Sequence, residues 1–133
     1  MKIYTLVLVL CLLLVTRCKN DDDCVPPILK ENVIGTWSIK NSAFGFSESG
    51  SATFYSDGKV ESNPKDFLIS GEINGVILDK TSFTVIDSVL KLKASSADGT
   101  LFISESLDMT KNECDEIVFD VFGGLGKSTY KRK

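Results

Sequence analysis

The chain has 133 residues, of which 43% are hydrophobic and 25% are charged, and this composition is typical of a single globular domain. Its formal net charge of −3 provides no basic surface of the kind that binds nucleic acid. It contains no histidine, so the usual general base and the commonest ligand for transition metals are both missing. We therefore expect a small non-catalytic protein that has no metal site, no cofactor and no nucleic-acid partner.

Residues 1–17 have the pattern of a secretory signal peptide. Lys2 places a positive charge near the N-terminus, and residues 3–15 are apolar except for Thr5. This apolar run is shorter than the roughly 20 residues that a transmembrane helix needs, but it has the length of a signal peptide. We expect the segment to be removed during export.

The end of this segment resembles the lipobox of bacterial lipoproteins, on the residues Leu14-Val15-Thr16-Arg17-Cys18. Val15 and Thr16 fit that motif, whereas Arg17 stands where the family usually has Gly, Ala or Ser. The resemblance implies that Cys18 becomes the first residue of the mature chain and carries acyl chains such as palmitate. Such chains anchor a protein to a membrane at about 0.8 kcal/mol per buried CH₂ group.

Residues 18–32 form the expected tether between this anchor and the folded domain. The three consecutive aspartates at 21–23 repel one another and stay solvated, which by itself explains the acidic run. The run also resembles the tether of lipoproteins from Bacteroidetes, and that resemblance implies anchoring to the outer membrane with export to its outer face. The sequence leaves open whether the protein reaches the periplasmic or the cell-surface face. Residues 28–32, which follow Pro27, fit one helical turn.

Residues 33–133 have the pattern of β-strands separated by turns. The first segment, 33–39, alternates apolar and polar side chains and carries the only tryptophan, Trp37. The same period of two recurs in the segments 51–56, 59–62, 82–86, 89–93, 100–107, 115–122 and 128–132. The other segments are expected to be loops or polar connections, at 42–50, 63–80 and 109–114, although the apolar runs within 63–80 also fit short strands. About eight strands at this spacing predict an all-β sandwich or barrel.

Three parts of this pattern resemble the lipocalin-like domain found in many lipoproteins of Bacteroidetes. They are Ile34–Trp37, which contains a Gly-x-Trp motif, Ala52–Val60 and Thr129–Arg132. The resemblance implies a small antiparallel up-and-down β-barrel of about eight strands over residues 33–133. It also implies that Trp37 plugs the closed end of the barrel and that Arg132 stacks on its indole ring, a contact worth about 0.5–2 kcal/mol. The alternative is that Trp37 forms part of the floor of a ligand pocket.

The inward face of this barrel is expected to be bulky and apolar. Its expected members are Trp37, Ile39, Phe54, Phe83, Val85, Leu90, Leu92, Leu101, Ile103, Ile117, Phe119, Val121 and Tyr130. An eight-stranded barrel is just wide enough to be filled by its own side chains or to hold one small ligand, and both remain open. The residues expected to contact such a ligand are Phe54, Phe83, Leu92, Ile103, Phe119 and Tyr130.

The cysteines differ in their expected roles. Cys11 lies in the signal peptide and Cys18 is the expected acyl acceptor, which leaves Cys24 and Cys114. An even pair in the oxidising envelope predicts a disulfide, which closes a long loop and stabilises the fold by up to about 4–5 kcal/mol. Two free thiols are the alternative, because sequence does not show whether the sulfur atoms meet. The chain has neither a further thiol nor a histidine to complete a zinc site.

Two functions are compatible with the sequence. The first is a membrane-anchored, non-catalytic binding lipoprotein whose barrel holds a small apolar ligand, as the apolar interior and the resemblance suggest. The alternative is a structural or protein-interaction lipoprotein with a filled barrel, which acts as an accessory subunit or an inhibitor. In that case the loops 42–50, with Phe44 and Phe46, and 63–80 are expected to contact an envelope protein partner.

Overall fold

A computed structural model describes residues 24–133, so the expected signal peptide, the acyl acceptor Cys18 and the first part of the tether lie outside the described residues. One helical turn, α2 (Leu29–Asn32), precedes the strands, as the sequence predicts. The strands are β1 (Gly35–Ala43), β2 (Phe46–Phe54), β3 (Val60–Asn63), β4 (Gly71–Ile73), β5 (Val76–Leu78), β6 (Lys80–Ile86), β7 (Val89–Ser95), β8 (Phe102–Asn112), β9 (Glu116–Val121) and β10 (Gly126–Arg132), with a 3₁₀ turn η1 (Phe122–Gly124) before the last. Within the described range, no helix has the length and apolar composition needed to span a bilayer.

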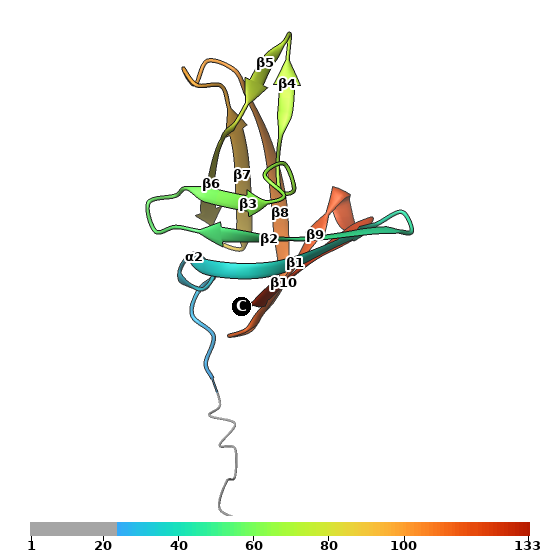
Figure 1. Ribbon diagram of the computed structural model, residues 1–133. Coiled ribbons are helices and arrows are strands. Elements are labelled where there is room, and N and C mark those ends of the chain that lie inside the picture. The colour runs from blue at the N-terminus through green and yellow to red at the C-terminus, as the bar shows by residue number, and fades with distance from the viewer. Residues whose placement is uncertain (1–23) are drawn as a thin grey trace, which may run out of the picture.

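Eight of the strands form one antiparallel sheet in the order β3-β2-β1-β10-β9-β8-β7-β6, and this sheet curls into a nearly closed barrel (Figure 1). β10 lies against β1 with Arg132 opposite Trp37, so the last strand pairs with the first. The two edge strands approach each other at a bridge between Lys59 and Ser82. The prediction of an all-β, eight-stranded up-and-down barrel is therefore confirmed. β4 and β5 form a separate hairpin that projects from one end (Figure 1).

The core is built from side chains that point inward at alternate positions of the barrel strands. Its aromatic members contact one another, since Phe54 meets Phe83 edge-on with ring centroids 5.0 Å apart and Phe119 meets Tyr130 at 5.0 Å. Three residues expected on the inward face are only half-buried: Val85, Leu101 and Ile103. Val85 lies on the edge strand β6, Leu101 lies just before β8, and Ile103 lies near the start of β8.

The loop expected at 42–50 is wrong, because this segment is the outer half of a long β1–β2 hairpin. The two strands are joined by the pair Phe44-Gly45, both of which have positive φ, at 53° and 81°. Positive φ at both central residues is typical of a type I′ turn, which usually contains Asn-Gly or Asp-Gly. This part of the hairpin extends beyond the packed core, and Phe46 within it is 81% exposed. The residues after the turn are therefore polar, and this polarity suggested a loop.

The polar connection expected at 109–114 is also wrong, because β8 continues to Asn112. A β-bulge between Met109 and Lys111 shifts the register there, and it breaks the alternation that marks a strand in sequence. Segment 63–80 contains the β4–β5 hairpin, whose Asn74-Gly75 turn is a common hairpin signal. The rest of that segment is irregular.

Candidate functional site

A partly open cavity of about 450 Å³ lies in the barrel at the end that bears the β1–β2 turn. We call this the open end, and we call the end that holds α2, Trp37 and Arg132 the closed end. The apolar walls of the cavity come from six strands, from the irregular segment before β4 and from η1, through Ala43, Phe46, Phe67, Leu68, Leu92, Leu107, Val121, Phe122 and Tyr130. A cavity of this size and lining is typical of a small-molecule site, for which volumes of roughly 300–1,000 Å³ are usual.

A row of polar side chains forms one wall of the cavity. Asn41 on β1 is paired with Glu48 on β2 and with Ser128 on β10, so the three lie side by side across neighbouring strands. Asn41 Nδ2 donates a hydrogen bond to Glu48 Oε1 at 3.3 Å, and Ser128 Oγ donates one to Asn41 Oδ1 at 2.5 Å. The row therefore holds its own geometry while it faces the cavity.

Tyr130 brings an unpaired hydroxyl to the same place. The residue is fully buried, and its hydroxyl has no hydrogen-bond partner among residues 24–133. Burial raises the pKa of Tyr130, the nearby Ser128 hydroxyl lowers it, and the Glu105 carboxylate raises it further. The hydroxyl therefore stays protonated at neutral pH. Leaving such a group unpaired costs about 1–3 kcal/mol, which a polar atom of a ligand or a water would offset.

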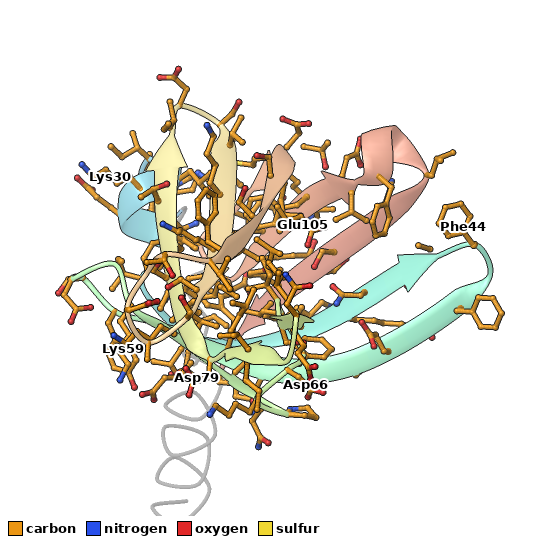
Figure 2. The ribbon with its side chains drawn as sticks, turned by 90° about the horizontal axis from the view of Figure 1, so that it is seen from above. Lys30, Phe44, Lys59, Asp66, Asp79 and Glu105 are labelled. Carbon is orange, nitrogen blue, oxygen red and sulfur yellow. A yellow bond between two sulfur atoms is a disulfide. The ribbon has the colours of Figure 1, made fainter. Side chains whose placement is uncertain are left out.

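Glu105 places a carboxylate on the opposite wall, on β8 beside Leu92 of β7. Burial raises the pKa of Glu105, because the apolar surroundings disfavour its charged form. Its contribution to stability is therefore greatest at acidic pH and is lost as the pH rises through its folded-state pKa. Figure 2 shows Glu105 within the side chains of the barrel, whereas Phe44 lies at the outer tip of the β1–β2 hairpin.

The residues expected to contact a ligand are divided by the structure into three groups. Leu92 and Tyr130 line the cavity. Phe54, Phe83 and Phe119 are packed in the core below it. The last of the six, Ile103, does not line the cavity; it packs against the core and lines a neighbouring recess together with Leu68 and Glu105. The rings of Phe54, Phe83 and Phe119 therefore fill the middle of the barrel themselves, and the cavity is lined beside Tyr130 by other aromatic residues, Phe46, Phe67 and Phe122.

Sequence reasoning missed the polar residues of the cavity, although the sequence contains a signal for them. Asn41 follows the inward residues of β1 at the same spacing of two, Ser128 precedes Tyr130 by two, and Glu105 precedes Leu107 by two. A polar residue at an inward position of an apolar face is uncommon, because burying it without a partner is costly. Phe67 has no such signal, since it lies in an irregular segment and reaches the cavity only through tertiary packing.

The closed end is filled by Trp37 and covered by Arg132. Trp37 is fully buried, and its Nε1 donates a hydrogen bond to the Val33 carbonyl oxygen at 2.8 Å. The guanidinium of Arg132 lies over the indole ring at 4.3 Å from the ring centroid, so the contact expected from the resemblance is present. Gly35 has φ of +123° and leaves room for Arg132, because a Cβ there would lie 2.9 Å from the Arg132 Nη1 atom.

The guanidinium also joins separate parts of the chain. It donates to the carbonyl oxygens of Cys114, Ile34 and Asn32 at 3.0, 3.3 and 2.9 Å, and to Asn32 Oδ1 at 2.8 Å. Asn32 is buried and extends this hydrogen-bond network, since its Nδ2 donates to Asn112 Oδ1 and to the Glu113 carbonyl oxygen, both at 2.7 Å. This network fixes α2 against the end of the barrel.

The predicted disulfide between Cys24 and Cys114 is confirmed. The two residues are 90 positions apart in the sequence, and their Cα atoms lie 6.2 Å apart. Because the Cys114 carbonyl oxygen also accepts from Arg132, the bridge attaches the tether at the closed end.

The two ends of the barrel thus differ in chemistry. The closed end is a dense structural cap that also receives the tether, whereas the open end holds a cavity with apolar walls and unpaired polar groups. Comparison with family models, with curated proteins and with solved structures finds no match for the chain. The functional argument therefore depends on the geometry of these two ends.

Proposed function

We propose that the protein is a membrane-anchored, non-catalytic binding lipoprotein whose lipocalin-like barrel holds a small, largely apolar ligand. The observation that carries this proposal is the cavity of about 450 Å³ at the open end, with apolar walls and the buried, unpaired Tyr130 hydroxyl. A barrel that served only as a scaffold would gain stability from filling this space, at about 25 cal/mol for each Å² of apolar surface removed from water.

The position of the disulfide supports an orientation for the anchored protein. With acyl chains on Cys18, six residues of chain reach at most about 20 Å to Cys24. Cys24 is joined to Cys114 at the closed end, so that end stays near the membrane surface. The cavity at the open end then faces away from the outer membrane, where a ligand from the aqueous phase has access to it.

A dye titration tests the proposal. The apolar dye N-phenyl-1-naphthylamine should show a saturable rise in fluorescence with the chain from Lys19 onward, because residues 24–133 contain the whole core. Intrinsic tryptophan fluorescence is a poor probe, since Trp37 lies at the closed end. Replacing Val121 in the cavity wall with tryptophan should weaken dye binding by about tenfold or more, because the indole occupies the space.

Replacing Val76 with tryptophan is the matched control for this titration. Val76 is 41% exposed on β5 and lies outside the cavity lining, so the same side chain added there should leave dye binding unchanged. Circular dichroism checks that both variants are folded. No saturable binding to the unmodified chain, or equal loss in both variants, would contradict the proposal.

A second candidate function is favoured by exposed apolar residues beside the cavity. Phe44, Phe46, Phe122 and Leu125 are 68%, 81%, 61% and 64% exposed, and the rings of Phe44 and Phe122 lie 6.1 Å apart. We call these four residues the tip cluster. Clustered exposed apolar side chains mark protein interaction sites. The alternative is therefore an accessory or inhibitory lipoprotein that docks an envelope protein through the tip cluster.

Crosslinking in solubilised outer membrane separates the two functions. If the tip cluster docks a protein, the double variant Phe44→Ser/Leu125→Ser should lose a specific crosslinked species while it still binds the dye, because these two members of the cluster do not line the cavity. The control is Ile77→Ser, which removes an apolar side chain of 68% exposure from β5 and should keep the crosslink. A crosslink that survives in the double variant would show that the tip cluster is not the docking surface.

A further inference from the structure

The charged side chains that line the cavity are acidic. Glu48 from β2 and Glu105 from β8 face it, and the lining within residues 24–133 includes no lysine or arginine. Two carboxylates in one partly enclosed space repel a further anion and attract a cation. The charge of the lining therefore discriminates between the head groups of amphiphilic ligands.

Glu105 is the carboxylate that is better placed to receive a ligand. Glu48 already accepts a hydrogen bond from Asn41, whereas none of the salt bridges in the described chain involves Glu105. Glu105 is half-buried between apolar side chains, with Leu92 opposite and Leu107 two positions along β8. A carboxylate that is partly desolvated and has no cation gains from a charge-assisted hydrogen bond.

Tyr130 adds a second polar group to the cavity that Glu105 lines. Its hydroxyl is fully buried and unpaired within residues 24–133. A phenolic oxygen accepts as well as donates. An ammonium group carries enough N–H donors to bond a carboxylate and a phenolic oxygen together, whereas a carboxylate head has none.

On the basis of the proposed function, we propose that the cavity selects amphiphiles with a primary ammonium head and an apolar tail. Glu105 holds the ammonium charge, and the Tyr130 oxygen accepts one of its N–H groups. The tail lies along the apolar wall that includes Phe67 and Leu107. Alkyl carboxylates are rejected by like-charge repulsion, and alkyl alcohols bind more weakly because they bring no charge.

Competition against N-phenyl-1-naphthylamine tests this selectivity with three probes of equal tail length. Decylamine, decanol and decanoate are titrated at pH 7, below their aggregation concentrations, against the chain from Lys19 onward. Decylamine should displace the dye at a concentration about tenfold lower than decanol or decanoate requires. The variant Glu105→Gln should weaken decylamine by about tenfold and leave decanol unchanged.

Glu72→Gln on β4 is the matched control, since Glu72 is exposed and does not line the cavity. Tyr130→Phe removes the phenolic oxygen and should weaken decylamine more than decanol. If decanoate competes as well as decylamine, or if Glu105→Gln leaves the probe order unchanged, the inference is wrong and the binding function stands. If the dye itself shows no saturable binding to the unmodified chain, the proposed function fails instead.

Discussion

Replacing Trp37 with alanine should lower the free energy of unfolding by about 3–5 kcal/mol, the usual cost of removing a large buried aromatic side chain. Trp37 is fully buried at the closed end, where the indole packs beneath Arg132 and bonds the Val33 carbonyl oxygen. Urea unfolding followed by circular dichroism measures the change, since the variant has no tryptophan to report it.

In the same assay, Arg132→Met measures how much the contacts of Arg132 contribute to stability, apart from the burial of the indole. Methionine keeps much of the packing over the indole but loses the four hydrogen bonds of the guanidinium and its cation–π contact. Because these bonds are partly exposed, the expected loss is smaller, about 2–3 kcal/mol. A loss from Trp37→Ala that is smaller than the loss from Arg132→Met would show that the closed end depends on the network rather than on the indole.

The closed end was predictable because its residues carry strong and local sequence signals. A tryptophan two residues after a glycine, on an alternating strand, is evident from the sequence. The pairing of its strand with the last strand, however, was implied only by the resemblance to lipocalins. The structure adds the reason for the glycine, since a side chain at position 35 would meet the Arg132 guanidinium.

The open end was much less predictable, for physical reasons. The Phe44-Gly45 turn at this end has a rare composition for its geometry. Elsewhere in the barrel, the bulge after Met109 hides the end of β8 from a search for alternation. Phe67 reaches the cavity from an irregular segment and packs against Gly50, where a Cβ would lie 2.6 Å from its ring. Such contacts depend on where distant strands end, which no local pattern records.

The residues of the candidate site were predictable only in part. Leu92 and Tyr130 were predicted as ligand contacts and line the cavity, whereas Asn41, Ser128 and Glu105 were not. All three interrupt an apolar inward face with a polar side chain. That interruption is a useful signal in a small barrel, because evolution tolerates a buried polar group where it bonds a neighbour or serves a function.

Removing the disulfide by the double change Cys24→Ser/Cys114→Ser should lower the free energy of unfolding by up to about 4–5 kcal/mol, because the bridge closes a loop of 90 positions in the unfolded chain. Both cysteines are replaced so that no free thiol remains. Urea unfolding with and without a reductant provides the measurement and its control. The reductant should destabilise the unmodified chain and leave the double variant unchanged, whereas equal curves for both proteins would contradict the prediction.

The same variant also tests whether the two ends of the barrel act independently. The bridge lies at the closed end and the cavity at the open end, so dye affinity should change by less than about twofold under conditions where the variant stays folded. We expect the two ends to be independent because the packed aromatic core, which includes Phe54 and Phe119, lies between them. The double change of the cysteines does not alter this core. A larger change in dye affinity would mean that the disulfide at the closed end influences the binding cavity through this core. In the proposed lipoprotein, the closed end that receives the tether would then be coupled to ligand binding at the open end.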